Sequence, residues 1–188
     1  ETQESIVHMF QRSDATHVSV DPTKTSLAGT GGKLVFGKGA GLWQYSMGGN
    51  WRSPELELND VGFLRETDLI RQFANLRAQF LDPTSWYRSA SLRFSQSSTY
   101  DFQGNNNRLQ YDFRGEVNTI NNWNFEMGLT HKPLININAF LRGGPRWRFS
   151  EENFMFFSVG SDDRKKLAVG AGFVKSQAHD NNFSLDRY

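Results

Sequence analysis

The feature that most limits the fold of this chain is the stretch from Arg108 to Asn118, where polar and apolar residues alternate without a break. An alternation with a period of two places successive side chains on opposite faces of a β-strand, so one face would be apolar and the other would carry charges of both signs. A tilted strand needs about 9–11 residues to cross a bilayer, whereas strands of globular proteins most often have about five or six. We therefore predict a membrane-crossing strand whose apolar face contacts lipid.

Charge and hydropathy exclude two classes of protein. Lysine and arginine number 21 against 20 aspartates and glutamates, a net charge of +1 that lacks the basic surface of a nucleic-acid binder. The mean hydropathy is negative, and no window approaches the roughly 18 consecutive apolar residues of a membrane helix. A transmembrane barrel agrees with this composition, because only every second residue of its strands faces lipid. The absence of cysteine excludes disulfides and thiol chemistry.

Alternating or short apolar segments predict further strands along the chain. The segment 67–80 fits a strand and also a helical stripe, but the neighbouring strands need a pairing partner, which favours the strand. All five prolines lie between predicted strands, where a missing N–H removes no ladder hydrogen bond. We predict one strand at 5–10, a second after the loop that follows it, and others at 26–38, 42–52, 67–80, 86–94 with a weak continuation to 102, 108–118, 123–130, 134–141, 146–149, 154–160 and 167–173, before a polar tail.

These segments predict an all-β fold, an antiparallel meander of a transmembrane outer-membrane β-barrel. We expect roughly eight to ten of these segments to form the strands of the barrel, in hairpin order. They would form a single β-barrel domain or barrel section over residues 1–188, with no separate second domain. Trp43 and Trp51 lie near the two ends of the predicted strand 42–52, as in the aromatic belts of membrane interfaces.

Several loop elements resemble those of one family at corresponding positions along the chain. Gln11-Arg12-Ser13-Asp14 is similar to a Gln-Arg-Pro-Asp element of this family, and residues 21–29 are similar to its element Asp-Pro-Thr-x-Thr-Ser-Leu-x-Gly. Residues 53–63 are similar to a third element, Ser-Pro-Gly-Phe-Glu-x-Asn-Asp-x-Gly-Phe, and a basic residue and Asp68 follow it. The family comprises outer-membrane proteins of unknown function that carry an N-terminal domain similar to carbohydrate-binding family 9. Arg142-Gly143-Gly144-Pro145 resembles a further element of this family. The loop-motif residues carried over are Ser53, Pro54, Asn59, Asp60, Gly62, Phe63, Arg142, Gly143, Gly144 and Pro145.

The resemblance implies a location in the outer membrane of a Gram-negative bacterium. It implies that the chain is an interior section of a larger barrel, which lacks the N-terminal domain and further strands. The implied partners are the lipid bilayer and the rest of the same barrel, with other outer-membrane or periplasmic proteins and a glycan as further candidates. The family brings no established catalytic residues. The chain departs from its pattern at Ser13, where proline is usual, and at Glu55-Leu56, where Gly-Phe is usual.

The polar face of the predicted strands carries charges that would point into the barrel lumen. Two interpretations are open: these charges could line a path for a solute, or they could neutralise each other in a water-filled lumen. The neutralising network is the default. From the alternation, the strand length, the aromatic ends and the ordered motifs together, we expect a section of an outer-membrane barrel that acts as a channel, a transporter-like protein or an envelope scaffold. The predicted lumen-facing charges are Arg71, Arg77, Arg93, Asp112, Arg114, Glu116 and Glu126.

Other chemistry has weaker support in the sequence. Glu55, Glu57, Asn59 and Asp60 could offer oxygen ligands to calcium, but they lack EF-hand spacing, and an acidic surface loop is the commoner explanation. The four histidines, His8, His17, His131 and His179, are scattered without an i, i+4 pair. We therefore predict no metal and no cofactor.

Two alternatives to a membrane barrel stay open. One is a soluble all-β carbohydrate-binding module, in which the apolar face would be an internal core. The other is a hydrolase inside the barrel, which would need a nucleophile, a base and an orienting group brought together. Serines such as Ser95 and a histidine such as His131 are available, but the pattern marks no serine above the others.

Overall fold

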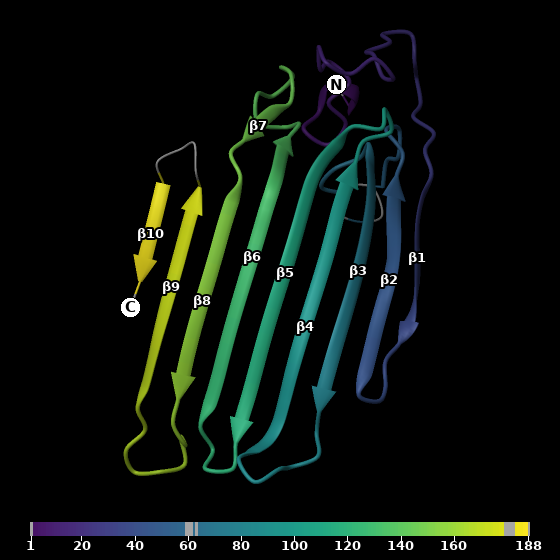
Figure 1. Cartoon of the computed structure of the whole chain (residues 1–188). Coiled ribbons are helices and arrows are strands. Elements are labelled where there is room, and N and C mark those ends of the chain that lie inside the picture. The colour runs from purple at the N-terminus through teal and green to yellow at the C-terminus, as the bar shows by residue number, and fades with distance from the viewer. Residues whose placement is uncertain (1, 59–61, 63, 179–182, 188) are drawn as a thin grey trace.

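The chain forms one antiparallel β-sheet (Figure 1). The computed structural model describes residues 2–58, 62, 64–178 and 183–187, and within them it contains a three-residue 3-10 helix, Thr2–Glu4 (η1), and no α-helix. No helix in this described part is long and apolar enough to cross a membrane. The strands are β1 (Gly31–Lys38), β2 (Trp43–Arg52), β3 (Leu69–Phe80), β4 (Tyr87–Tyr100), β5 (Asn106–Thr119), β6 (Asn124–Ile137), β7 (Trp147–Phe149), β8 (Glu152–Gly160), β9 (Gly170–Ala178) and β10 (Phe183–Arg187).

The strands follow one another as a meander, as the sequence predicts. Each of β1 to β5 pairs with the strand that follows it in the sequence, and the order of the sheet then continues with β6, β8, β9 and β10. The short strand β7 lies off this path and pairs with the end of β6. The strands β4, β5 and β6 have 14 residues each, which spans about 45 Å at a rise of about 3.3 Å per residue. The sheet is open, with β1 and β10 at its two edges.

The ambiguous segment 67–80 forms the strand β3. It pairs with β2 over residues 69–78 and with β4 over residues 70–80, so its backbone groups find partners on both sides. The helical stripe is divided between the two faces of the sheet, because Leu69 and Phe73 lie on one face and Leu76 and Phe80 on the other.

The predicted strands before residue 21 are wrong. Residues 5–10 form turns whose backbone hydrogen bonds are local, such as Met9 N to Ser5 O at 3.0 Å and Phe10 N to Gln3 O at 3.0 Å. The apolar side chains of Met9 and Phe10 are buried by these turns instead of lying along a strand. The first strand begins at Gly31, five residues after the predicted start.

Pro133 does not separate two strands but lies inside β6. The register between β5 and β6 shifts here, because Leu109 faces Leu134 while Tyr111 faces His131. The extra residue on β6 makes a bulge, and a bulge is a place where proline is tolerated within a sheet. The strand predicted at 134–141 is therefore the last part of β6, and residues after 137 form turns.

The C-terminal strands also differ from the prediction. The last predicted alternation, 167–173, is shifted, because β9 begins at Gly170 and runs to Ala178. The residues predicted as a polar tail include the strand β10. As an edge strand, β10 pairs only with β9, through backbone groups, so it does not need the long apolar alternation that reveals a half-buried strand.

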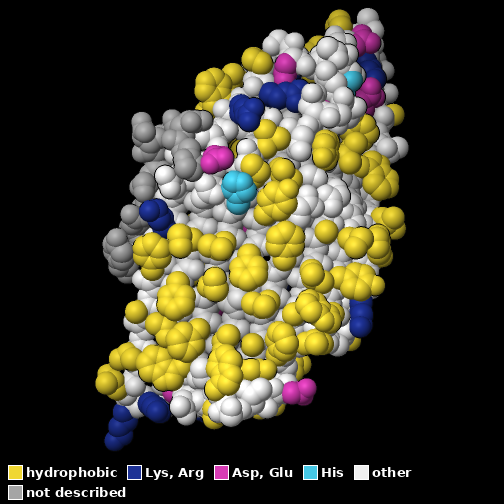
Figure 2. Space-filling view, viewed as in Figure 1, with side chains coloured by type: hydrophobic (Ala, Val, Ile, Leu, Met, Phe, Trp, Pro, Cys, Tyr) yellow, Lys and Arg dark blue, Asp and Glu magenta, His cyan; other side chains and the backbone are white. Residues whose placement is uncertain are grey.

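One face of the sheet is apolar and uncovered. We call this the apolar face; Figure 2 shows its hydrophobic side chains spread over the lower two-thirds of the view. Among the described residues, the buried hydrophobic side chains are Met9, Phe10, Leu56, Leu64 and Ala78, and all but Ala78 belong to the segments that pack at one end of the sheet. The sheet itself therefore has no second layer over its apolar face in the described part of the chain. Its exposed side chains include Phe36, Met47, Leu76, Leu92, Phe94, Tyr111, Phe125, Met127, Leu129, Met155 and Phe157.

Candidate functional site

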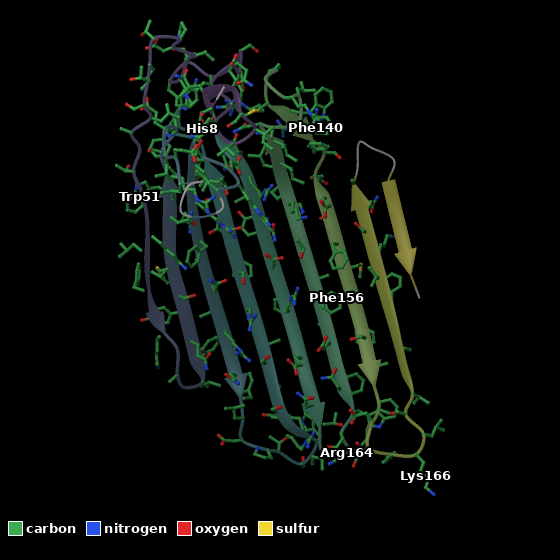
Figure 3. All side chains as sticks on the ribbon, turned by 180° about the vertical axis from the view of Figure 1, so that it is seen from behind. His8, Trp51, Phe140, Phe156, Arg164 and Lys166 are labelled. Carbon is green, nitrogen blue, oxygen red and sulfur yellow. The ribbon has the colours of Figure 1, made fainter. Side chains whose placement is uncertain are left out.

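The opposite face, which we call the polar face, gathers the predicted lumen-facing charges. Residues directly opposite each other in an antiparallel pair share a face. Asp112 lies opposite Ser95 and Thr130, and Glu116 lies opposite Ser91 and Glu126. Figure 3 views the sheet from this side, with Phe156 on β8. The register places all seven predicted charges on this one face: Arg71, Arg77, Arg93, Asp112, Arg114, Glu116 and Glu126.

Three of the arginines form a row across neighbouring strands. Arg77 on β3 lies opposite Arg93 on β4, which lies opposite Arg114 on β5. No ion pair joins these three to a carboxylate within the described residues. The guanidinium carbon of Arg114 instead lies 5.7 Å from the ring centroid of Phe156, a cation–π distance. The neutralising network that the sequence suggests is not formed at this row, which we call the arginine row.

The acidic residues beside the arginine row accept hydrogen bonds from neutral groups. Asp112 accepts from Gln110 Nε2 at 2.9 Å and from Thr130 Oγ1 at 2.7 Å. Glu116 accepts from Asn118 Nδ2 at 3.0 Å. These bonds use part of the hydrogen-bonding capacity of both carboxylates, and none of the donors is an arginine.

Two hollows lie over the polar face. The larger, of about 850 Å³, is lined by residues that include Lys33, Arg71 and Asp112. The other, of about 450 Å³, borders the arginine row and is lined by residues that include Arg77 and Arg93. Both hollows are open, and both are lined by charged and neutral polar side chains together with apolar ones such as Val35 and Phe73.

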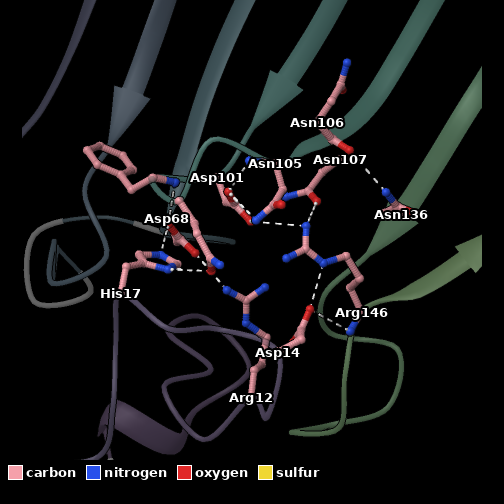
Figure 4. A network of polar contacts seen from close by, with 12 residues as sticks. Arg12, Asp14, His17, Asp68, Asp101, Asn105, Asn106, Asn107, Asn136 and Arg146 are labelled. Carbon is pink, nitrogen blue, oxygen red and sulfur yellow. Dashed lines mark hydrogen bonds and ion pairs between the residues drawn. The ribbon is translucent and has the colours of Figure 1, made fainter.

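A second polar arrangement lies at the end of the sheet where the N-terminal segment packs. Figure 4 shows this end cluster, which we define as Arg12, Asp14, His17, Asp68, Asp101, Asn105, Asn107 and Arg146. Its centre is the pair between Arg12 Nη2 and Asp68 Oδ2 at 2.8 Å, whose side chains are 1% and 4% exposed. His17 Nε2 and the backbone N of Phe102 contact the other oxygen, Asp68 Oδ1, at 2.8 and 2.9 Å. Asp68 therefore joins three separate segments of the chain.

Arg146 makes the other half of the end cluster. Its Nε lies 2.7 Å from Asp14 Oδ2, and its Nη1 lies 3.3 Å from Asp101 Oδ2 and 3.1 Å from Asn107 Oδ1. Burial would raise the pKa of Asp14, but the hydrogen bonds and charge of Arg146 outweigh it and hold the pKa below the ordinary 3.8. Asp14 and Arg146 are 132 residues apart, so this pair fastens the N-terminal segment to the loop before β7.

The lowered pKa of Asp14 makes this fastening sensitive to acid. A carboxylate with a lowered pKa adds stability at pH values above its unfolded pKa, and that stability is lost as the pH falls through the folded pKa. We expect backbone amides of residues 9–15 to exchange faster with deuterium as the pH drops below about 4, after correction for the intrinsic exchange rate. Asp14→Asn should reduce this pH dependence, and a dependence unchanged in that variant would contradict the assignment.

The loop motifs converge on this same end of the sheet. Ser53 Oγ accepts a hydrogen bond from Thr30 N at 2.7 Å and so fixes the loop after β2 beside the start of β1. Gly143 has a φ of +115°, and a Cβ there would lie 2.8 Å from Gln11 Cγ, so glycine fits where the 142–145 element contacts the 11–14 element. Pro54, Gly62, Arg142, Gly144 and Pro145 lie in the same loops, whereas Asn59, Asp60 and Phe63 lie outside the described residues.

The described residues among those considered for metal binding and hydrolysis do not gather. Glu55 pairs with Lys24, and in the described part of the chain no three His, Asp or Glu side chains are placed to hold a metal. Ser95 lies on the polar face, whereas His131 lies on the other face, beside Tyr111 and 2.7 Å from Asn153 Oδ1. The ring nitrogens of His17 contact Asp68 and Gln103, which leaves neither free for a substrate. His179 lies outside the described residues.

Sequence reasoning missed the end cluster as a unit. Arg12, Asp14 and Asp68 belong to the recognised elements, and Arg146 directly follows the 142–145 element. The opposite charges in these separate loop elements could therefore have indicated ion pairs between the loops. Asp101 and Asn107 carried no such signal, because they appear in the sequence as ordinary turn residues.

The comparisons with known proteins give one family. Residues 1–186 match the family described as Domain of unknown function (DUF5916). No curated protein and no solved structure matches the chain.

Proposed function

Because the chain belongs to the DUF5916 family of domains of unknown function, its role has to be inferred from its own geometry, and we propose that it is a section of an outer-membrane β-barrel. In this proposal the apolar face contacts the hydrocarbon of the bilayer. The polar face lines a water-filled lumen through which solutes pass.

The observation that carries the proposal is the uncovered apolar face. Phe94, Phe113, Leu129 and Met155 lie opposite one another on β4, β5, β6 and β8. Phe94 and Leu129 are 46% and 45% exposed. Soluble monomers seldom expose a contiguous apolar patch beyond a few hundred Å², and this one extends across most of the sheet. Lipid is the solvent that such a face fits.

The height of the apolar face agrees with a bilayer. On β5 the face runs from Leu109 to Val117, which is about 27 Å along the strand at about 3.4 Å per residue. Strands of outer-membrane barrels tilt by about 35–45°, and their lipid-facing band is about 25 Å tall. The tilted face would therefore be about 20 Å tall, close to that band.

Aromatic side chains mark both ends of this face. Trp43, Trp86 and Trp123 are exposed near the end of the sheet that holds the β3–β4 and β5–β6 turns. Trp51 and Tyr100 are exposed on the same face near the opposite end, where both lie opposite Ile70 of β3. Tryptophan is enriched at membrane–water interfaces, because its ring is apolar and its N–H can reach water or headgroups. Two such girdles separated by an apolar band are typical of outer-membrane barrels.

The two sheet edges define what else the proposal requires. The strands β1 and β10 each have one neighbour, so the backbone groups on their outer sides lack ladder partners. Lipid cannot satisfy these groups, and an open edge within the hydrocarbon is too costly to persist. In a membrane the edges must pair, either with each other or with further strands.

Spin labels on β6 test the proposal directly. We expect a label at Leu129→Cys, on the apolar face, to collide with oxygen, which concentrates in lipid, more than with a water-soluble nickel chelate. A label at the adjacent Thr130→Cys, on the polar face, should show the reverse, and the sequence has no native cysteine to interfere. The measurement is electron paramagnetic resonance on the full-length protein in liposomes. Equal access of both labels to the chelate would refute the proposal.

A further inference from the structure

The arginine row places like charges side by side. Neighbouring strands lie about 4.8 Å apart, so the Cα atoms of Arg77, Arg93 and Arg114 span about 10 Å across β3, β4 and β5. Like charges directly opposite each other in an antiparallel pair destabilise it. A row of three therefore needs either an acidic partner or a bound anion to be favourable.

No acidic side chain lies directly opposite a member of the row in the sheet. The register places two acidic and seven basic side chains on the polar face of β1 to β5. The acidic pair is Asp112 and Glu116, and the basic set is Lys33, Arg52, Arg71, Arg77, Arg93, Arg108 and Arg114. Glu126, on β6, lies opposite Glu116 rather than opposite an arginine. This part of the face therefore has excess positive charge.

The row also has unused hydrogen-bond donors. Arg77 Nε is buried and has no hydrogen-bond partner, which is costly for a charged group. The adjoining hollow of about 450 Å³ is lined by Arg77 and Arg93 together with the neutral polar side chains of Gln44, Asn75 and Ser95. Guanidinium groups bind phosphate and carboxylate groups with two parallel hydrogen bonds, and amides and hydroxyls complete such sites.

We propose that the hollow beside the arginine row binds a small anionic solute that bears two or more phosphate or carboxylate groups. Arg77 and Arg93 hold one group, and Arg114, at the end of the row, attracts the next. Glu116 and Glu126 lie beyond the row, where they and the three arginines line a smaller hollow of about 140 Å³. Their negative charge keeps the anion on the other side of the row. The inference rests on the proposed function, because it names the class of solute that the lumen accepts.

Calorimetric titration with pyrophosphate and with citrate tests this inference, on the full-length protein in detergent at low salt. We expect one or both probes to bind, which also distinguishes phosphate from carboxylate chemistry. Arg93→Gln should weaken binding at least tenfold. Glu126→Gln should strengthen it several-fold, because it removes a repelling charge. Arg148→Gln, on β7 and outside the row, should leave the affinity unchanged and serves as the matched control.

Two results would overturn the inference: no binding of either probe to the native protein, or the same affinity in Arg93→Gln as in the native protein. Raised salt should lower the affinity, because it screens these charges. A heat-dependent shift on an unboiled gel verifies that each variant is folded. A protein that passes the spin-label test but fails the titration refutes the anion site alone. One that fails the spin-label test refutes the membrane proposal, whatever it binds.

Discussion

Asp68→Ala is expected to lower the free energy of unfolding by about 3–5 kcal/mol, which is the cost of removing one partner from a buried ion pair. The Arg12 side chain is 1% exposed, and its Nε and Nη1 have no hydrogen-bond partner. Without Asp68, its Nη2 would also lose its partner. His17 Nε2 and Phe102 N would each lose an acceptor as well. The measurement is urea unfolding of the full-length protein in detergent, followed by tryptophan fluorescence and by the gel shift.

The matched control is a more exposed ion pair. Glu152 binds Lys132 across β6 and β8, and the two side chains are 34% and 26% exposed. Such pairs contribute about 0–1 kcal/mol, so Glu152→Ala should change the unfolding free energy by no more than this. A loss in Asp68→Ala as small as that in Glu152→Ala would show that the end cluster is not what fastens the N-terminal segment. Asp68→Asn retains the side-chain oxygen and tolerates the φ of +54°, so it should lie between the two.

The end cluster explains why separate loop elements occur together in this chain. Arg12 and Asp14 belong to the N-terminal segment, Asp68 precedes β3, and Arg146 precedes β7. Each of these segments alone has few apolar residues to bury. Charge-assisted hydrogen bonds are stronger than neutral ones and have defined directions. They can therefore fix these three segments against the end of a sheet that offers only a small apolar core.

The strands from β2 to β6 could be predicted from the sequence because one face of each carries mainly apolar side chains and the other mainly polar ones. The period of two then fixes the face of every residue, so Arg77 and Arg93 could be assigned to the polar face before their partners were known. An interruption of this alternation does not always mean that the strand ends, because a strand can contain a bulge. Pro133 marked a break in the prediction, whereas the structure absorbs it in a bulge of β6.

The ends of the chain and the end cluster could not be predicted in the same way. Residues 5–10 are too short an apolar run to distinguish a strand from a buried turn. The contacts of Asp14 with Arg146 and of His17 with Asp68 join residues 132 and 51 positions apart. No local periodicity carries information about such pairs. The missing ion pairs of the arginine row are also a property of side-chain placement, which the alternation alone cannot reveal.

Phe94→Arg is expected to be the most damaging single change on the sheet. Phe94 lies on the apolar face between Leu76 and Phe113. An arginine at the middle of a lipid-facing band costs about 2–4 kcal/mol, because its charge leaves water for hydrocarbon. We expect the variant to fold into liposomes less completely than the native protein and to unfold at a lower urea concentration. The gel shift measures the folded fraction in both cases.

Ser95→Arg is the matched control, because it adds the same side chain one residue further along β4. Ser95 lies on the polar face, between Asn75 and Asp112, where the new charge stays in water and gains a carboxylate neighbour. We expect its folded fraction in liposomes to match that of the native protein. If the two variants behaved alike, the two faces of β4 would share one solvent, and the chain could not be part of a barrel wall. A loss confined to Phe94→Arg in liposomes identifies lipid as the solvent of the apolar face, because exposed phenylalanine in water can be replaced by arginine at little cost.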